Sequence, residues 1–141
     1  MRKLNLINSE NPIDLTQLQE IEKRIGVTIP DDYKKFLQIT NGGFGRHNFH
    51  EKFFIRDFVT LTGKNSLADI FFPVSELFHG SKDWLPFGFD DGDWIFCICL
   101  KIDKFGKIYL MRTDEGDCEE DAFIYVCDSF KEFLDGLQIE K

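Results

Sequence analysis

Apolar residues recur with a helical period in two segments of the amino-terminal third of the chain. Asp14 is a suitable N-cap, Gln17 follows three residues later, and Gly26 ends the first predicted helix. The apolar positions of that helix are Leu15, Leu18, Ile21 and Ile25. Pro30 suits the first turn of a second helix. The second helix is predicted to have an apolar face of Tyr33, Phe36, Leu37 and Thr40, and to stop at Asn41, Gly42 and Gly43.

The period changes after residue 52, where aromatic and β-branched residues favour strands. We expect one strand over 53–61 and a second short strand that begins at residue 70 and ends at Pro73. One helical turn is expected from Ser75 to Phe78, before Gly80. The sequence favours helix in that turn less clearly than in the two amino-terminal segments.

A meander of strands is predicted in the second half of the chain. WLPFG, residues 84–88, leads into a turn at 90–93, and residues 94–100 are apolar on both faces, which is typical of a central, buried strand. A tight turn at 103–106 precedes the strand KIYLMR, and an acidic loop at 113–121 precedes the strand AFIYV. These strands are expected to pair as antiparallel neighbours.

A last amphipathic helix follows the strands. Ser129 and Glu132 form a predicted capping box. The apolar positions are Phe130, Phe133, Leu134 and Leu137, at the spacing i, i+3, i+4 and i+7. The order of helices, strands and helix predicts an α+β fold in which helices pack on an antiparallel sheet. We expect a single domain over 1–141 with its core at about 14–138.

Composition indicates which class of partner and which cellular compartment to expect. The formal charge of −8 repels phosphate backbones, which disfavours nucleic acid, and it permits a basic protein partner. No apolar run approaches the length of a membrane helix and no signal peptide is recognisable, so we expect no membrane association and a cytoplasmic protein. The four cysteines are then expected to be reduced.

The residues that carry chemistry do not form a recognisable catalytic set. His47 and His50 are expected in a solvated loop, because their spacing matches no metal motif. Cys97 and Cys99 share one face of an apolar strand and are expected to be buried thiols, and Cys118 is flanked by acids that make it a poor nucleophile. We therefore predict no enzyme, no metal and no cofactor.

Two acidic clusters and one tryptophan are the candidate partner-binding residues. They are Trp84, the turn residues Asp90, Asp91 and Asp93, and the loop residues Asp114, Glu115, Asp117, Glu119, Glu120 and Asp121. The acids are either a solvated surface that aids solubility or a docking surface for a basic protein. Candidate buried anchors are Trp84, Trp94, Phe44, Phe49 and Phe53, each with core packing as its alternative, and Trp84 is expected to be the most exposed.

The order of several motifs resembles that of the SUKH superfamily. The amino-terminal matches are Ile29, Pro30, Asp32, Tyr33, Phe36, Leu37, Asn41, Gly42 and Gly43. The later matches are the dipeptide Gly92-Asp93 in its turn and the closing helix CDSFKEFLDGL. Each motif alone is weak, but their order and spacing together are specific, and they span nearly the whole chain.

The resemblance implies a curved sheet flanked by helices and a non-catalytic protein. Two roles are known in the superfamily, bacterial immunity proteins against toxins and fungal regulators of cell-wall glucan synthesis. For a small, acidic chain the resemblance favours an immunity protein that binds and neutralises a cognate toxin encoded nearby, with a nuclease as the candidate class of toxin. The alternative is a regulatory or scaffold protein of the glucan-synthesis type. The sequence leaves the oligomeric state open between a monomer and a weak dimer.

Overall fold

The fold is described from a computed structural model that covers residues 1–63, 66–113 and 119–139. Helix α1, Leu15–Ile25, begins where the sequence predicts. The Asp14 carboxylate accepts a hydrogen bond from the Gln17 amide at 2.8 Å, and the Gln17 side chain accepts one from the Asp14 amide at 3.1 Å. Gly26 adopts φ 76° at the C-cap, the left-handed conformation that glycine adopts without steric cost.

Helix α2, Asp31–Ile39, buries the predicted face, and Thr40 is buried at its end. Gly42 and Gly43 have positive φ angles, as expected of a helix stop. Gly43 is also needed for a close approach, because a Cβ atom there would lie 2.5 Å from the Ile7 carbonyl oxygen. The segment after α2 therefore lies directly against the amino-terminal segment, where Ile7 and Phe44 form an isolated bridge.

The strand predicted over 53–61 is divided into two short pieces, β2, Phe53–Phe54, and β3, Asp57–Phe58. A strand that the sequence did not indicate, β1, His47–His50, pairs with β2. The prediction that His47 and His50 lie in a solvated loop is wrong. His50 is buried, its ring stacks on Phe133 with centroids 5.1 Å apart, and its Nδ1 atom lies 3.0 Å from the Phe133 carbonyl oxygen.

Helix α3, Leu67–Leu77, replaces the strand predicted to end at Pro73 and includes most of the helical turn expected after it. The amide of Ser66 donates to the Asp69 carboxylate at 3.3 Å, which fixes the first turn. Leu67, Phe71 and Val74 lie on one buried face at helical spacing. Burial of this face outweighs both the aromatic β-propensity and the cost of Pro73 inside the helix.

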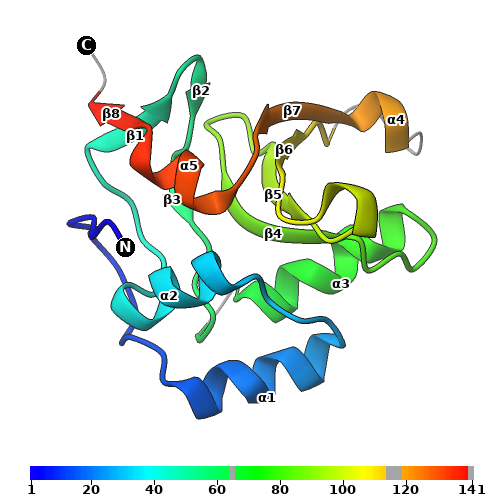
Figure 1. The fold of residues 1–141 in the computed structure, drawn as a ribbon, viewed down its shortest axis with the longest axis horizontal. Helices are drawn as coiled ribbons and strands as arrows, with labels where there is room; N and C mark the ends of the chain where they lie inside the picture. Colours follow the sequence, from blue (N-terminus) through cyan, green and yellow to red (C-terminus); the bar gives the residue numbers. More distant parts are fainter. Residues whose placement is uncertain (64–65, 114–118, 140–141) are drawn as a thin grey trace.

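The second half of the chain forms the predicted antiparallel meander. Strands β4, Trp84–Phe89, β5, Ile95–Cys99, β6, Ile108–Met111, and β7, Phe123–Cys127, make a five-stranded sheet in the order β3-β4-β5-β6-β7 (Figure 1). Strand β5 is central and all five of its residues are buried, as predicted. A short 3-10 turn, η1, Ile102–Lys104, joins β5 to β6, and helix α4, Glu119–Ala122, precedes β7.

The last helix is shorter than its apolar spacing indicates. Helix α5, Phe130–Asp135, is capped by Ser129, whose hydroxyl accepts from the Glu132 amide at 3.0 Å. Leu137 does not extend the helix and instead begins β8, Leu137–Ile139, which pairs with β1. Gly136 lies between them, where a Cβ atom would come within 2.6 Å of His50 Nδ1. The result is a small sheet with the order β2-β1-β8.

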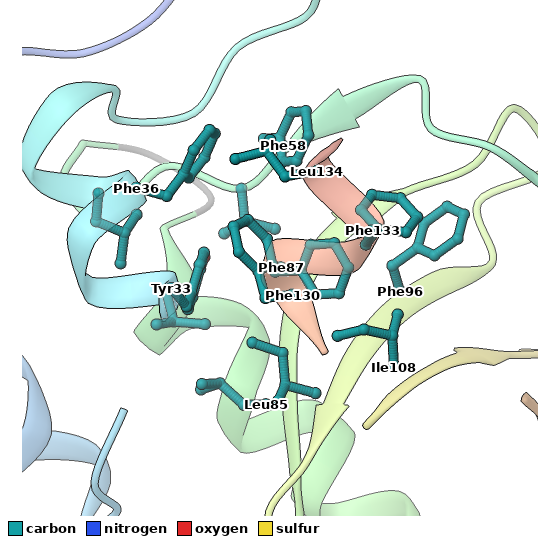
Figure 2. Packing of buried hydrophobic residues seen from close by; sticks show 14 of the residues in the cluster. Tyr33, Phe36, Phe58, Leu85, Phe87, Phe96, Ile108, Phe130, Phe133 and Leu134 are labelled. Atoms are coloured by element: carbon teal, nitrogen blue, oxygen red, sulfur yellow. The ribbon is translucent and has the colours of Figure 1, made fainter. Parts of the chain in front are cut away.

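The core lies on both faces of the larger sheet. On one face, aromatic rings from α2, β4, β5 and α5 pack together, with the ring centroids of Phe87 and Phe130 5.2 Å apart (Figure 2). On the opposite face, Val74 and Phe78 pack over the side chains of Cys97 and Cys99. The two thiols are thus buried on one face of β5, as predicted, and the fold is the expected α+β arrangement of helices on an antiparallel sheet.

Candidate functional site

The register of the larger sheet brings the two acidic segments to the same end. One row of paired residues, Asp57, Phe89, Ile95, Met111 and Phe123, crosses all five strands. The turn that joins β4 to β5 lies beyond this row, as do the described residues 112–113 and 119–122 of the connector that joins β6 to β7. We call this the acidic end of the sheet, defined by residues 90–94 and 112–122.

The whole net charge of the chain belongs to this end. Its two segments contain nine of the 25 acidic residues and one of the 17 basic residues, so the remainder of the chain has 16 of each. The acidic excess is therefore concentrated at one end, and the long-range field of the protein is directional.

The turn at 90–93 is a preformed structure with two outward carboxylates. Asp90 Oδ1 accepts from the amides of Gly92 at 2.9 Å and Trp94 at 2.8 Å, which makes Asp90 a structural residue of the turn. Asp93 adopts φ 63° and remains exposed, and Asp91 is exposed beside it. Of the three predicted residues, Asp91 and Asp93 are available to a partner.

Arg56 lies beside the turn, and no sequence motif marks it as a candidate residue. Its Nη1 atom is 2.9 Å from Asp93 Oδ1, its Nε atom is 3.0 Å from Asp57 Oδ2, and its guanidinium carbon lies 5.9 Å from the centroid of Phe89. The hydrogen bond that Arg56 donates to the Asp57 carboxylate is the main cause that raises the pKa of Arg56. The side chain of Arg56 is 42% exposed, so these pairs orient the turn more than they stabilise the fold.

A groove of about 550 Å³ opens beside this ion-pair cluster. Phe44, Ile70 and Phe89 give it apolar walls, and Arg56 and Asp93 border it. Phe44 is 40% exposed, which agrees with its selection as a possible anchor, whereas Phe49 and Trp94 are half-buried and Phe53 is buried. The groove therefore combines apolar and charged side chains next to the acidic turn.

The other predicted acids fall partly outside the described residues. Asp114, Glu115 and Asp117 belong to the undescribed stretch 114–118, which also contains Cys118. Glu119 and Glu120 begin helix α4, and Asp121 in the same helix is exposed. The Asp121 carbonyl accepts a hydrogen bond from Arg112, which connects α4 to the residue that follows β6.

The predicted exposure of Trp84 is wrong. Trp84 is 5% exposed, and its ring stacks on Phe123 with centroids 3.6 Å apart and planes 12° from parallel. The partner lies on β7, far away in the sequence, so proximity to a turn was a poor guide to exposure. Trp84 belongs to the core on the α3 side of the sheet.

Reactive groups are not gathered into a second site in the described part of the chain. Burial raises the pKa of the Cys97 thiol and raises that of Cys127 to about 12, so both are protonated at neutral pH. Among the described residues, three or more His, Cys, Asp or Glu side chains nowhere converge in a way that could hold a metal ion. The described helices are also too short or too polar to cross a membrane.

The model of the SMI1/KNR4 family, SUKH-1, matches residues 12–136. The chain belongs to the SUKH-1 family. A search of curated proteins finds no significant match. The family is generally non-catalytic and is associated with protein–protein interaction.

The SUKH-1 motif residues are mainly structural in this chain. Ile29 is buried and its amide donates to Glu22 at 2.8 Å, and the Asp32 carboxylate accepts from the Lys131 amide of α5 at 3.1 Å. Asn41 is fully buried, and its side-chain amide binds two other segments. It donates to the Asn11 carbonyl and the Thr62 hydroxyl and accepts from the Leu61 amide. These motif residues therefore stabilise the fold, whereas the acidic end lies largely outside the motif.

Proposed function

We propose that this SUKH-1 protein is an immunity protein that binds a basic toxin in the cytoplasm and neutralises it through the acidic end of its sheet. The observation that supports the proposal most directly is the confinement of the entire net charge to residues 90–94 and 112–122. A uniformly solvated acidic surface would not need this concentration. A directional field accelerates encounter with a basic partner and orients it.

A basic surface on the toxin would be electrostatically complementary to the acidic end. Nuclease toxins hold phosphate with lysine and arginine, so Asp91, Asp93 and the acids of the β6–β7 connector would occupy the same side chains that bind substrate. The apolar side chains of Phe44, Ile70 and Phe89 in the groove beside Arg56 offer neighbouring area for desolvated contacts. Neutralisation would then follow from occlusion, without any catalytic step.

The first experiment is co-expression of this chain with the toxin domain encoded beside its gene. We expect growth rescue and a one-to-one complex by size-exclusion chromatography. Absence of both would contradict the proposal and favour the regulatory or scaffold alternative.

A pair of charge variants locates the surface. Asp91→Lys with Asp121→Lys changes two exposed acids at the acidic end, and Glu20→Lys with Asp103→Lys makes the same net change at exposed positions elsewhere. At low salt the first pair should slow association by about tenfold or more, and the second should have a much smaller effect. Equal effects would show that only total charge matters and that the acidic end is not the docking surface.

A further inference from the structure

Within the part of the chain that the structure describes, the larger sheet has one closed edge and one open edge. At the β3 edge, the strand is two residues long and Phe58 is bridged by Gly43, whose carbonyl accepts from the Phe58 amide at 2.7 Å. At the other edge, β7 is five residues long, and no strand within the described ranges pairs with its outer side. Figure 1 shows β7 along the outside of the molecule, between α4 and α5.

The backbone groups that face outward from β7 can be assigned from the pairing. The Arg112 amide donates to the Ala122 carbonyl at 2.7 Å, and hydrogen-bonded and non-bonded pairs alternate along an antiparallel ladder. Ile124 is therefore bonded to β6, whereas the N–H and C=O groups of Phe123 and Tyr125 point to the open side. A bulge after Tyr125 ends this regular segment.

Strand β7 lacks the usual protection of an open edge in its first three residues. Edge strands are commonly blunted by charged side chains or proline, and FIYVC has neither. The bulge lies beyond Tyr125, so Phe123 to Tyr125 remain regular. Such an edge is a template for pairing with another chain.

Charge at the ends of β7 decides which chain fits. Glu119, Glu120 and Asp121 precede the strand and Asp128 follows it. In an antiparallel pair of two copies centred on Tyr125, Ala122 of each copy would lie opposite Asp128 of the other, and the acids at both ends would repel. A strand with basic residues at its ends would instead be attracted.

We propose that β7 adds an extended strand of a basic protein partner to the sheet, with backbone hydrogen bonds at Phe123 and Tyr125 and basic residues of the partner beside the acids that flank β7. The inference rests on the proposed function in that the toxin is the partner. It adds the mode of recognition, which is strand addition at a sheet edge.

The part of the α3 side of the sheet that lies next to β7 supplies a surface for the side chains of the added strand. Tyr109 and Tyr125 lie edge to face with centroids 5.7 Å apart, and Phe123 is next to them. Tyr125 is 49% exposed and Phe123 is half-buried. An aromatic or β-branched side chain on the partner strand would pack there as a cross-strand neighbour.

Amide hydrogen exchange by NMR tests the pairing directly on the wild-type protein. In the free protein, the Ile124 amide should exchange slowly and the amides of Phe123 and Tyr125 quickly. Two probes are added in turn: the toxin domain, and a synthetic peptide of alternating threonine and valine with two lysines at each end. Each should slow exchange at Phe123 and Tyr125 by about tenfold or more, and a peptide with glutamates at its ends should not.

Two variants separate backbone pairing from side-chain contact. Tyr125→Pro removes the outward N–H, whereas Tyr125→Val keeps it and removes the aromatic ring. We expect Tyr125→Pro to weaken binding of the lysine-ended peptide by about tenfold or more and Tyr125→Val to weaken it less. Thermal melts check that both variants fold, and the exchange data on the wild type decide the question if Tyr125→Pro does not.

The outcomes distinguish this inference from the proposed function. A toxin complex that forms and rescues growth while Phe123 and Tyr125 stay in fast exchange would overturn strand addition and leave the immunity role intact. Protection by the lysine-ended peptide without any toxin binding would support the edge and refute the role. Fast exchange with both probes overturns the inference.

Discussion

The buried hydroxyl of Tyr33 allows a direct test of how the core is packed. Tyr33 is 1% exposed, and its ring lies 4.9 Å from that of Phe130 and 6.1 Å from that of Phe87, measured between centroids (Figure 2). Its hydroxyl oxygen has no hydrogen-bond partner among the described residues. Burial alone raises the pKa of Tyr33, in agreement with an apolar environment.

Tyr33→Phe should therefore stabilise the protein. A buried hydroxyl without a partner costs about 1–3 kcal/mol in desolvation, and phenylalanine keeps the ring contacts with Phe130 and Phe87. We expect the free energy of unfolding to rise by about 1–2 kcal/mol, because the small space left by the oxygen reduces the gain. For a chain of this size, the midpoint of thermal unfolding should rise by roughly 3–5 °C per kcal/mol.

Guanidinium unfolding measures the difference, with an unchanged denaturant slope as the check that both proteins unfold in the same way. Tyr125→Phe is the matched control, because the Tyr125 hydroxyl is at the surface and donates to Asp128. Its effect should stay within about 0.5 kcal/mol. A loss of stability in Tyr33→Phe beyond that range would show that the hydroxyl is hydrogen-bonded in solution, and the argument from burial would be refuted.

Three further changes test the hydrogen bonds of buried Asn41, the buried thiol of Cys97 and the turn before β8. Asn41→Ala removes two donated bonds and one accepted bond, to Asn11, Thr62 and Leu61 at 2.7–3.0 Å, and should lower the free energy of unfolding by about 3 kcal/mol in guanidinium. Burial raises the pKa of Cys97 in the folded protein, so above about pH 9 the thiol stays protonated when folded and ionises when unfolded, and the free energy of unfolding falls as pH rises. Cys97→Ala should make this fall shallower by up to roughly 1.4 kcal/mol per pH unit. An unchanged slope of stability against pH would contradict the assignment. Gly136→Ala places a methyl group against His50 and should destabilise by about 1–3 kcal/mol, whereas Gly80→Ala, which meets nothing within 4 Å, tests the cost of positive φ alone.

The elements that the sequence predicted well are those whose ends or burial are determined by neighbouring residues in the sequence. Helix α1 has its capping box and its glycine stop, and α5 has Ser129 at its start, so their amino-terminal ends follow from neighbouring residues. The uninterrupted apolar run at 95–99 similarly predicts a central strand without knowledge of its neighbours. In each case the decisive interaction lies within a few residues.

The elements that the sequence did not predict depend on distant contacts. The segment around Pro73 is helical because Phe71 and Val74 bury against the sheet, and Leu137 leaves the helix because β1, far away in the sequence, offers a strand to pair with. Trp84 is hidden by Phe123 in the same way. The two acidic clusters are visible in the sequence, but only the register of the sheet shows that they share one end.

The acidic end and the open edge of β7 would act at different stages of binding. Charges act over a distance of about 8–10 Å in physiological salt and mainly set how fast partners meet, whereas backbone pairing forms only in the docked complex and sets how slowly they separate. Charge reversal at Asp91 and Asp121 should therefore reduce the association rate and its salt dependence, and Tyr125→Pro should mainly increase the dissociation rate. Stopped-flow association and competition dissociation with the toxin domain separate the two rates. If both kinds of variant altered the same rate, charge steering and strand addition would not be distinct contributions, and a single contact surface at the acidic end would explain binding more simply.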